Sequence, residues 1–179
     1  MERERLVTML EIALMAAVSV ILSYVEFGAL WAYGGSISLV MVPIFIMMFR
    51  RGWKAGVLTG ALVGVIQLLT GGYVVHPVQL VLDYPLAYAV LGLGSVFAVR
   101  SVSSLSGIII AISIGSLLRL GSHFLSGIIW FGDYAPEGIP VALYSILYNA
   151  SYLVPEAAIT IIVVWLLKKY NPQFFKASS

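Results

Sequence analysis

Six long apolar stretches divide this chain, and they constrain its fold more than any other feature. They cover about residues 6–24, 36–49, 55–71, 78–99, 105–130 and 140–167. Most of them reach the ~17–25 residues that an α-helix needs to cross a bilayer. The second is short and contains Pro43, so a buried central position or local thinning of the bilayer would accommodate it. We therefore expect an all-α integral membrane protein, a single domain over residues 1–179 with six transmembrane helices.

The composition agrees with a membrane protein. Hydrophobic residues make up 61% of the chain and charged residues only 10%, with a mean hydropathy of +1.02. A soluble domain is about half apolar and about a quarter charged, so this chain has too little polar surface for water. The net charge of +2 is small and its bases lie at segment ends, so no nucleic-acid partner is expected. The chain has no cysteine, which excludes disulfides and thiolate metal sites.

The basic residues indicate how the helices are oriented. The N-terminus, the gaps at 50–54 and 100–104, and the C-terminus hold nine of the ten: Arg3, Arg5, Arg50, Arg51, Lys54, Arg100, Lys168, Lys169 and Lys176. The other three gaps hold none. Because Lys and Arg concentrate in cytoplasmic loops, we expect both termini in the cytoplasm, and an even number of spans agrees. The first stretch follows a mixed acidic and basic start without a cleavage site, so we interpret it as a retained helix.

The tenth basic residue, Arg119, lies inside an apolar stretch. A charge there costs at least about 2.5–3.5 kcal/mol on insertion scales and usually faces the bundle interior or a cavity. Asp83 and Glu156 also lie at membrane depth, whereas Glu11 lies only about one turn inside its helix. One interpretation is a structural ion pair of Arg119 with Asp83 or Glu156. The other is a polar binding site.

Polar and aromatic residues of three predicted helices favour the binding site. One stripe with i, i+4, i+8, i+11 spacing consists of Arg119, His123, Gly127 and Trp130. The last apolar stretch adds Tyr144 and Asn149, and the fourth adds Asp83, Tyr84 and Pro85. A packed apolar bundle does not need so many polar groups. An acid among aromatic faces suits a flat organic cation, which binds by stacking and cation–π attraction.

Small residues at four-residue spacing mark two further faces. Gly56, Gly60 and Gly64 form a ridge that lets another backbone approach closely. Ala13 and Ala17 follow the same spacing on the first helix. From spacing alone, we interpret both as internal packing.

Together these residues resemble the thiamine-specific S components (ThiT/YuaJ family) of energy-coupling factor (ECF) transporters, over nearly the whole chain. The stretches that carry the resemblance are residues 34–43, 82–87, 121–124 with Gly127 and Trp130, 144–145, 148–149 and 155–156. The resemblance implies high-affinity capture of extracellular thiamine (vitamin B1) at a prokaryotic plasma membrane, without a cofactor. It also implies docking on an ECF module, which is a transmembrane T subunit with two ATPase subunits of the ATP-binding-cassette type.

The resemblance also implies roles for particular residues. Asp83, Tyr84 and Asn149 match contacts to the aminopyrimidine ring of thiamine, with Arg119 nearby. His123, Tyr144 and Trp130, or Phe131 beside it, match residues around the thiazolium, and Gly127 would contact the ligand through its backbone. Trp31 or Tyr33, in a lid before the second helix, and Tyr73 complete the implied set. Ala13 and Ala17 would face the T subunit.

Two alternatives remain at this point. The chain could be an S component for another vitamin or for a thiamine precursor. It could also be an integral-membrane enzyme that uses His123 with Asp83 or Glu156 as acid–base groups. The sequence has no P-loop and no hydrolase pattern, so we expect a binding protein with no catalytic residues and no metal site.

Overall fold

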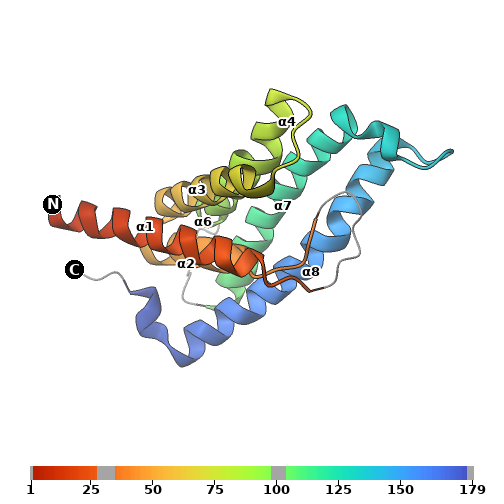
Figure 1. Cartoon of the computed structure of the whole chain (residues 1–179). Coiled ribbons are helices and arrows are strands. Elements are labelled where there is room, and N and C mark those ends of the chain that lie inside the picture. The colour runs from red at the N-terminus through yellow and green to blue at the C-terminus, as the bar shows by residue number, and fades with distance from the viewer. Residues whose placement is uncertain (1, 28–34, 98–103, 177–179) are drawn as a thin grey trace.

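The computed structural model describes residues 2–27, 35–97 and 104–176, and every regular element in these ranges is helical (Figure 1). Five helical segments are long and apolar enough to cross a membrane. They are α1 (Glu2–Ser23), α3 (Trp53–Gly71), the segment Pro77–Val96, α7 (Leu105–Trp130) and α8 (Val141–Tyr170). The all-α membrane fold is thus confirmed, with five helices of spanning length in the described ranges.

The sixth expected helix is shorter than the sequence predicted. A helix over residues 36–49 is wrong, because α2 begins at Met41 and ends at Arg51. Its length of 11 residues corresponds to about 16 Å at ~1.5 Å per residue, roughly half of a bilayer core. Pro43 lies in the first turn, where a missing N–H costs nothing. Every residue from Met41 to Met48 is buried, which confirms the central position expected for this segment.

The fourth spanning segment changes its helix type along its length. Its parts are α4 (Pro77–Val81), the π-helical η1 (Leu82–Leu86), α5 (Ala87–Ala89), the 3₁₀ turn η2 (Val90–Leu93) and α6 (Gly94–Phe97). Pro85 has no N–H to donate, and a π-turn is one way to absorb that loss. The hydroxyl of Ser122 on α7 donates to the carbonyl of Leu82 over 2.6 Å. The irregular segment carries Asp83 and Tyr84.

The glycine ridge of α3 packs against the backbone of this irregular segment. A Cβ atom built on Gly60 would lie 2.1 Å from the carbonyl oxygen of Tyr88, and one on Gly64 would lie 2.4 Å from that of Tyr84. Both distances are far below contact, so only glycine allows this approach. The prediction of internal packing is confirmed for this ridge.

Helices α7 and α8 lie side by side (Figure 1). The predicted range 105–130 is confirmed for α7, whereas α8 extends the prediction at 140–167 to Tyr170. A 3₁₀ turn, η3 (Gly132–Tyr134), lies in their connection, and another, η4 (Pro172–Phe175), follows α8. Figure 1 shows that α1 begins and α8 ends on the same side of the bundle.

On that side, charged residues join α1 to α2. Glu11 accepts from Arg50 over 2.8 Å and from Arg51 over 2.6 Å. Arg50 also donates to the carbonyl of Phe174 in η4 over 2.7 Å. We refer to Glu11, Arg50 and Arg51 as the α1–α2 ion cluster.

Candidate binding site

A cavity of about 630 Å³ opens between the helices. Its size lies within the range of small-molecule sites, about 300–1,000 Å³. Exposed residues such as Tyr24, Tyr73 and Tyr134 line its mouth, whereas the buried Tyr88 and Arg119 lie at its floor. The cavity therefore extends from solvent into the interior of the bundle.

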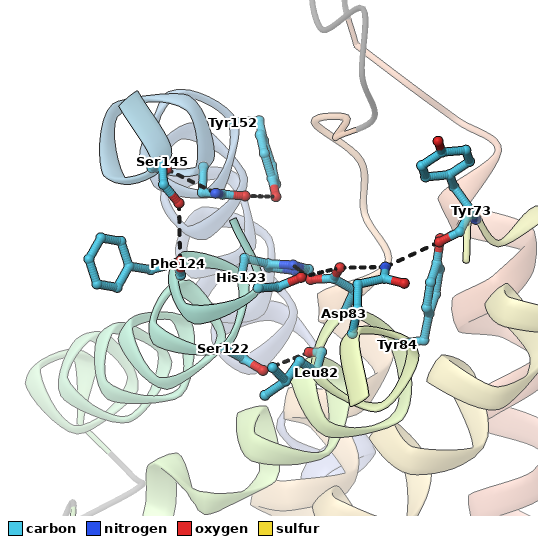
Figure 2. A network of polar contacts seen from close by, with 12 residues as sticks. Tyr73, Leu82, Asp83, Tyr84, Ser122, His123, Phe124, Ser145 and Tyr152 are labelled. Carbon is cyan, nitrogen blue, oxygen red and sulfur yellow. Dashed lines mark hydrogen bonds and ion pairs between the residues drawn. The ribbon is translucent and has the colours of Figure 1, made fainter. Parts of the chain in front are cut away.

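Asp83 is held by three side chains at the wall of this cavity (Figure 2). Its Oδ2 accepts from Gln79 over 2.7 Å and from Ser126 over 2.6 Å. Its Oδ1 lies 3.0 Å from Nδ1 of His123. An ionised carboxylate only accepts, so Nδ1 donates in this contact. The network fixes the orientation of the acid before any ligand arrives.

Two buried nitrogens in the cavity lack a partner within the described ranges. They are Nε2 of His123 and Nε of Arg119. An unsatisfied buried polar atom costs free energy, and native proteins satisfy nearly all of them. These two atoms therefore keep an unused hydrogen-bonding capacity beside the cavity.

Arg119 forms an ion pair with Glu156 on α8 at the cavity floor. Its Nη1 lies 2.9 Å from Oε2 of Glu156, and the two side chains are only 6% and 1% exposed. The other carboxylate oxygen accepts from Ser38 over 2.9 Å. The guanidinium also lies 4.4 Å from the ring centre of Tyr88. Of the two partners predicted for Arg119, the structure selects Glu156.

Helix α8 contributes aromatic rings and an amide to the same cavity. Tyr144 and Tyr148 lie one turn apart with ring centres separated by 5.7 Å. Asn149 donates to the carbonyl of Ser145 over 2.9 Å and accepts from the hydroxyl of Tyr152 over 2.7 Å. The amide is thus oriented by its neighbours, as Figure 2 shows for Ser145 and Tyr152.

Gly127 lines the cavity at the contact between α7 and α8. A Cβ atom there would lie 2.1 Å from Oγ of Ser145. The family resemblance implies that a ligand contacts the backbone of this glycine. In the structure, its missing side chain also lets α8 approach α7.

Trp130 occupies a different place from the rest of its stripe. Its ring stacks on His76, with centres 5.1 Å apart and an interplanar angle of 24°. Phe131, the alternative named from the sequence, lines the cavity, whereas Trp130 is not among the lining residues. The choice between the two as a ligand contact stays a prediction.

The cavity gathers most of the residues that the sequence singled out. Those that line it are Tyr73, Asp83, Tyr84, Arg119, His123, Gly127, Tyr144 and Asn149. Trp31 and Tyr33 lie outside the described residues. Ala13 and Ala17 are exposed on α1, so the reading of internal packing is wrong for these two.

Sequence reasoning missed several residues of this site, among them Gln79 and Tyr88. Gln79 lies four residues before Asp83, a spacing that places both on one helix face and could have indicated the contact. Tyr88 gave no signal beyond an aromatic ring in an apolar helix, although it lies against Arg119. Its contact with Arg119 depends on how α7 packs against the fourth segment, which the sequence does not show.

These features define an integral membrane protein with a preformed pocket for a small organic molecule. The described residues contain no group of three His, Asp or Glu side chains placed to hold a metal ion. The acid, the two unpartnered nitrogens and the surrounding tyrosines provide hydrogen bonds and ring contacts, which orient and retain a ligand.

Comparison with known proteins gives the family. The family model described as thiamine transporter protein (Thia_YuaJ) matches residues 9–176. The chain is 44% identical to the thiamine transporter ThiT of Bacillus subtilis (strain 168), over 98% of this chain and 97% of that protein. It is 32% identical to ThiT of Lacticaseibacillus paracasei, over 98% and 94%. It superposes on a solved structure of ThiT from Listeria monocytogenes with a TM-score of 0.83, at 31% identity, covering 96% of this chain and 98% of the other.

The chain belongs to the thiamine transporter family. It is therefore a multi-pass prokaryotic membrane protein of a transport family rather than an enzyme. The resemblance inferred from the sequence is confirmed.

Proposed function

We propose that this protein captures extracellular thiamine as the substrate-binding S component of an ECF-type transporter. The observation that carries the proposal is the cavity in which a fixed acid, Asp83, lies among tyrosine rings. Thiamine combines a flat aminopyrimidine, which offers hydrogen-bond donors and acceptors, with a cationic thiazolium. An acid and aromatic faces match both parts. The ligand is transported unchanged, and no cofactor is required.

The family resemblance implies a role for each of the lining residues. Asp83, Tyr84 and Asn149 contact the aminopyrimidine, and Arg119 lies near this uncharged ring. His123 and Tyr144 lie near the thiazolium, together with Phe131 or Trp130. Gly127 contacts the ligand through its backbone, Tyr73 lies at the mouth, and Trp31 or Tyr33 covers it. The support for this assignment is that nine of these residues line one cavity.

Intrinsic fluorescence tests the proposal, because the chain has four tryptophans. Trp130 is sequence neighbour to the cavity residue Phe131, so a bound thiamine should quench its emission. We expect saturable quenching of the purified protein by micromolar thiamine. Absence of both quenching and calorimetric heat would contradict the assignment of thiamine as the ligand. Tighter binding of the isolated pyrimidine precursor would instead favour an S component for that precursor.

We propose further that the bundle crosses the membrane with six helical segments, α2 included, and with both termini in the cytoplasm. One support is that nine bases fall in alternate gaps and in the two tails of the sequence. The other is that α1 begins and α8 ends on the same side of the bundle (Figure 1). Because the natural chain has no cysteine, single cysteines near each end can be labelled selectively. A membrane-impermeant maleimide should label them in inside-out vesicles and not in intact cells.

The exposed small residues of α1 support docking on the T subunit of an ECF module with its two ATPases. Small side chains allow close helix–helix approach in lipid. Ala13→Trp or Ala17→Trp should spare thiamine binding but block uptake. Leu117→Trp on α7, which is 64% exposed, is the control that should leave uptake unchanged. Normal uptake by both alanine variants would exclude this surface.

A further inference from the structure

The described residues that line the cavity include more acids than bases. Among the described residues, its lining contains one arginine, Arg119, and three acids, Glu26, Asp83 and Glu156. Glu26 is exposed at the mouth. Arg119 and Glu156 are paired at the floor. The wall is left with the charge of Asp83, whose three contacts come from groups that carry no fixed positive charge.

We propose that Glu156 determines ligand charge specificity: by neutralising Arg119, it leaves the cavity wall, below the exposed Glu26, with one uncompensated negative charge and so selects a monocation. This inference rests on the proposed thiamine function and deepens it. Without Glu156, Arg119 would either repel a cationic ligand or pair with Asp83 and cancel its charge. In both cases the cavity would lose its preference for a cation.

The geometry around Glu156 supports a fixed charge-balancing role. Both of its carboxylate oxygens are used, one by Arg119 and the other by Ser38, at 2.9 Å each. The side chain is 1% exposed, so its charge is weakly screened by water. Ser38 lies just before α2, and its hydroxyl is also 3.3 Å from the N–H of Val40. Thus the acid is held from two elements and cannot readily turn towards the ligand itself.

Arg119 is held in the same way. Tyr88 covers one face of its guanidinium at 4.4 Å, and Glu156 takes Nη1. Arg119 lines the cavity, and its buried Nε has no partner in the described ranges, so this N–H is an unused donor. The pair thereby supplies a hydrogen-bond donor without net charge. An arginine alone would supply the donor together with a repulsive charge.

The test compares thiamine with its uncharged carbon isostere, in which a thiophene replaces the thiazolium. Both share the aminopyrimidine, so the ratio of their affinities isolates the charge. In Glu156→Gln, we expect thiamine affinity to fall by roughly tenfold or more relative to the isostere. Ser38→Ala is the matched control, because it removes a hydrogen bond to the same carboxylate without changing a charge. Its affinity ratio should stay within about threefold of wild type.

If Glu156→Gln does not fold, two further variants test how the same charges affect the ratio of thiamine affinity to isostere affinity. The double variant Arg119→Gln/Glu156→Gln removes both charges and should keep the wild-type preference for thiamine. Arg119→Gln alone leaves Glu156 buried without a counter-ion, so relative to the double variant the ratio should shift towards thiamine as the pH is raised and Glu156 ionises.

The outcomes separate this inference from the function it rests on. A wild-type protein that binds neither ligand contradicts the thiamine function. A wild-type protein that binds thiamine, with affinity ratios that are equal in all folded variants, overturns the charge-balancing role alone. Equal weakening of both ligands in Glu156→Gln would mean a purely structural acid and would overturn it as well.

Discussion

The α1–α2 ion cluster and the pair of Arg119 and Glu156 both join helices, and they differ in what surrounds them. The α1–α2 ion cluster adjoins a small pocket of about 180 Å³ with an aliphatic lining that includes Leu14 and Met47. The pair of Arg119 and Glu156 lies at the floor of a cavity of about 630 Å³. Glu11 is 18% exposed, whereas Glu156 is 1% exposed.

The difference teaches where to look for function among buried charges. In the α1–α2 ion cluster, one acid meets two bases and connects α1, α2 and η4, which explains the charges by structure alone. At the cavity, Asp83, Arg119 and His123 also line a space large enough for a small organic ligand. Spacing along the sequence identified both as polar, but only the surroundings separate them.

The largest effect on ligand binding is expected from Asp83→Ala. It removes the carboxylate proposed to contact the ligand, and it leaves His123, Gln79 and Ser126 without their common acceptor. We expect a loss of about 2 kcal/mol or more in thiamine binding free energy, measured by calorimetry. A thiamine affinity within about threefold of wild type would contradict the assignment of this cavity.

A smaller effect is expected from Gly64→Ala, which presses α3 against the backbone of Tyr84. Overpacking of this kind typically costs about 1–3 kcal/mol, so the melting temperature in detergent should fall. Thiamine affinity should fall with it, since the displaced segment carries Asp83. The control is Gly71→Ala, where a Cβ meets nothing within 4 Å. Equal melting temperatures for the two variants would show that the close approach is not required.

A substitution in the α1–α2 ion cluster should lower stability without changing thiamine affinity. Glu11→Gln keeps the side-chain size but removes the charge that Arg50 and Arg51 share. We expect a loss of about 1 kcal/mol in unfolding free energy and an unchanged thiamine affinity. A thermal melt and a thiamine titration of the same sample check both parts. Weakened thiamine binding with normal stability would contradict a purely structural role for the α1–α2 ion cluster.

The smallest effect concerns the ring at the end of α7. Phe131→Ala should weaken thiamine binding by about 0.5–1.5 kcal/mol, because Phe131 lines the cavity and offers a ring face. Trp130→Ala should have less effect on affinity, since its ring stacks on His76. A larger loss for Trp130→Ala, measured by calorimetry, would place the tryptophan at the ligand instead.

Much of the fold was predictable because hydropathy marks membrane helices directly. The range 105–130 was correct, since Ser104 caps the helix start and Gly132 follows its end. The start of the second helix was wrong by several residues. Its apolar composition does not show that residues 35–38 stay outside the helix, where Ser38 reaches Glu156.

The site was predictable in its members and less so in its contacts. Depth in the membrane could not decide whether Arg119 pairs with Asp83 or Glu156, because both lie within reach by sequence. In the structure, Gln79, Ser126 and His123 contact the carboxylate of Asp83. Arg119 pairs with Glu156 instead. The π-helical turn at Asp83 was also hidden from the sequence. Pro85 signals a lost hydrogen bond, but not how the segment absorbs that loss.

The central claim is that the cavity around Asp83 binds thiamine, and titration calorimetry on the purified wild-type protein tests it most directly. We predict saturable binding with one thiamine per chain and a dissociation constant of roughly a micromolar or below. Glu11→Gln should give the same isotherm, and Asp83→Ala a much weaker one. No heat from micromolar thiamine with a folded wild-type protein, or equal isotherms for wild type and Asp83→Ala, would contradict the claim.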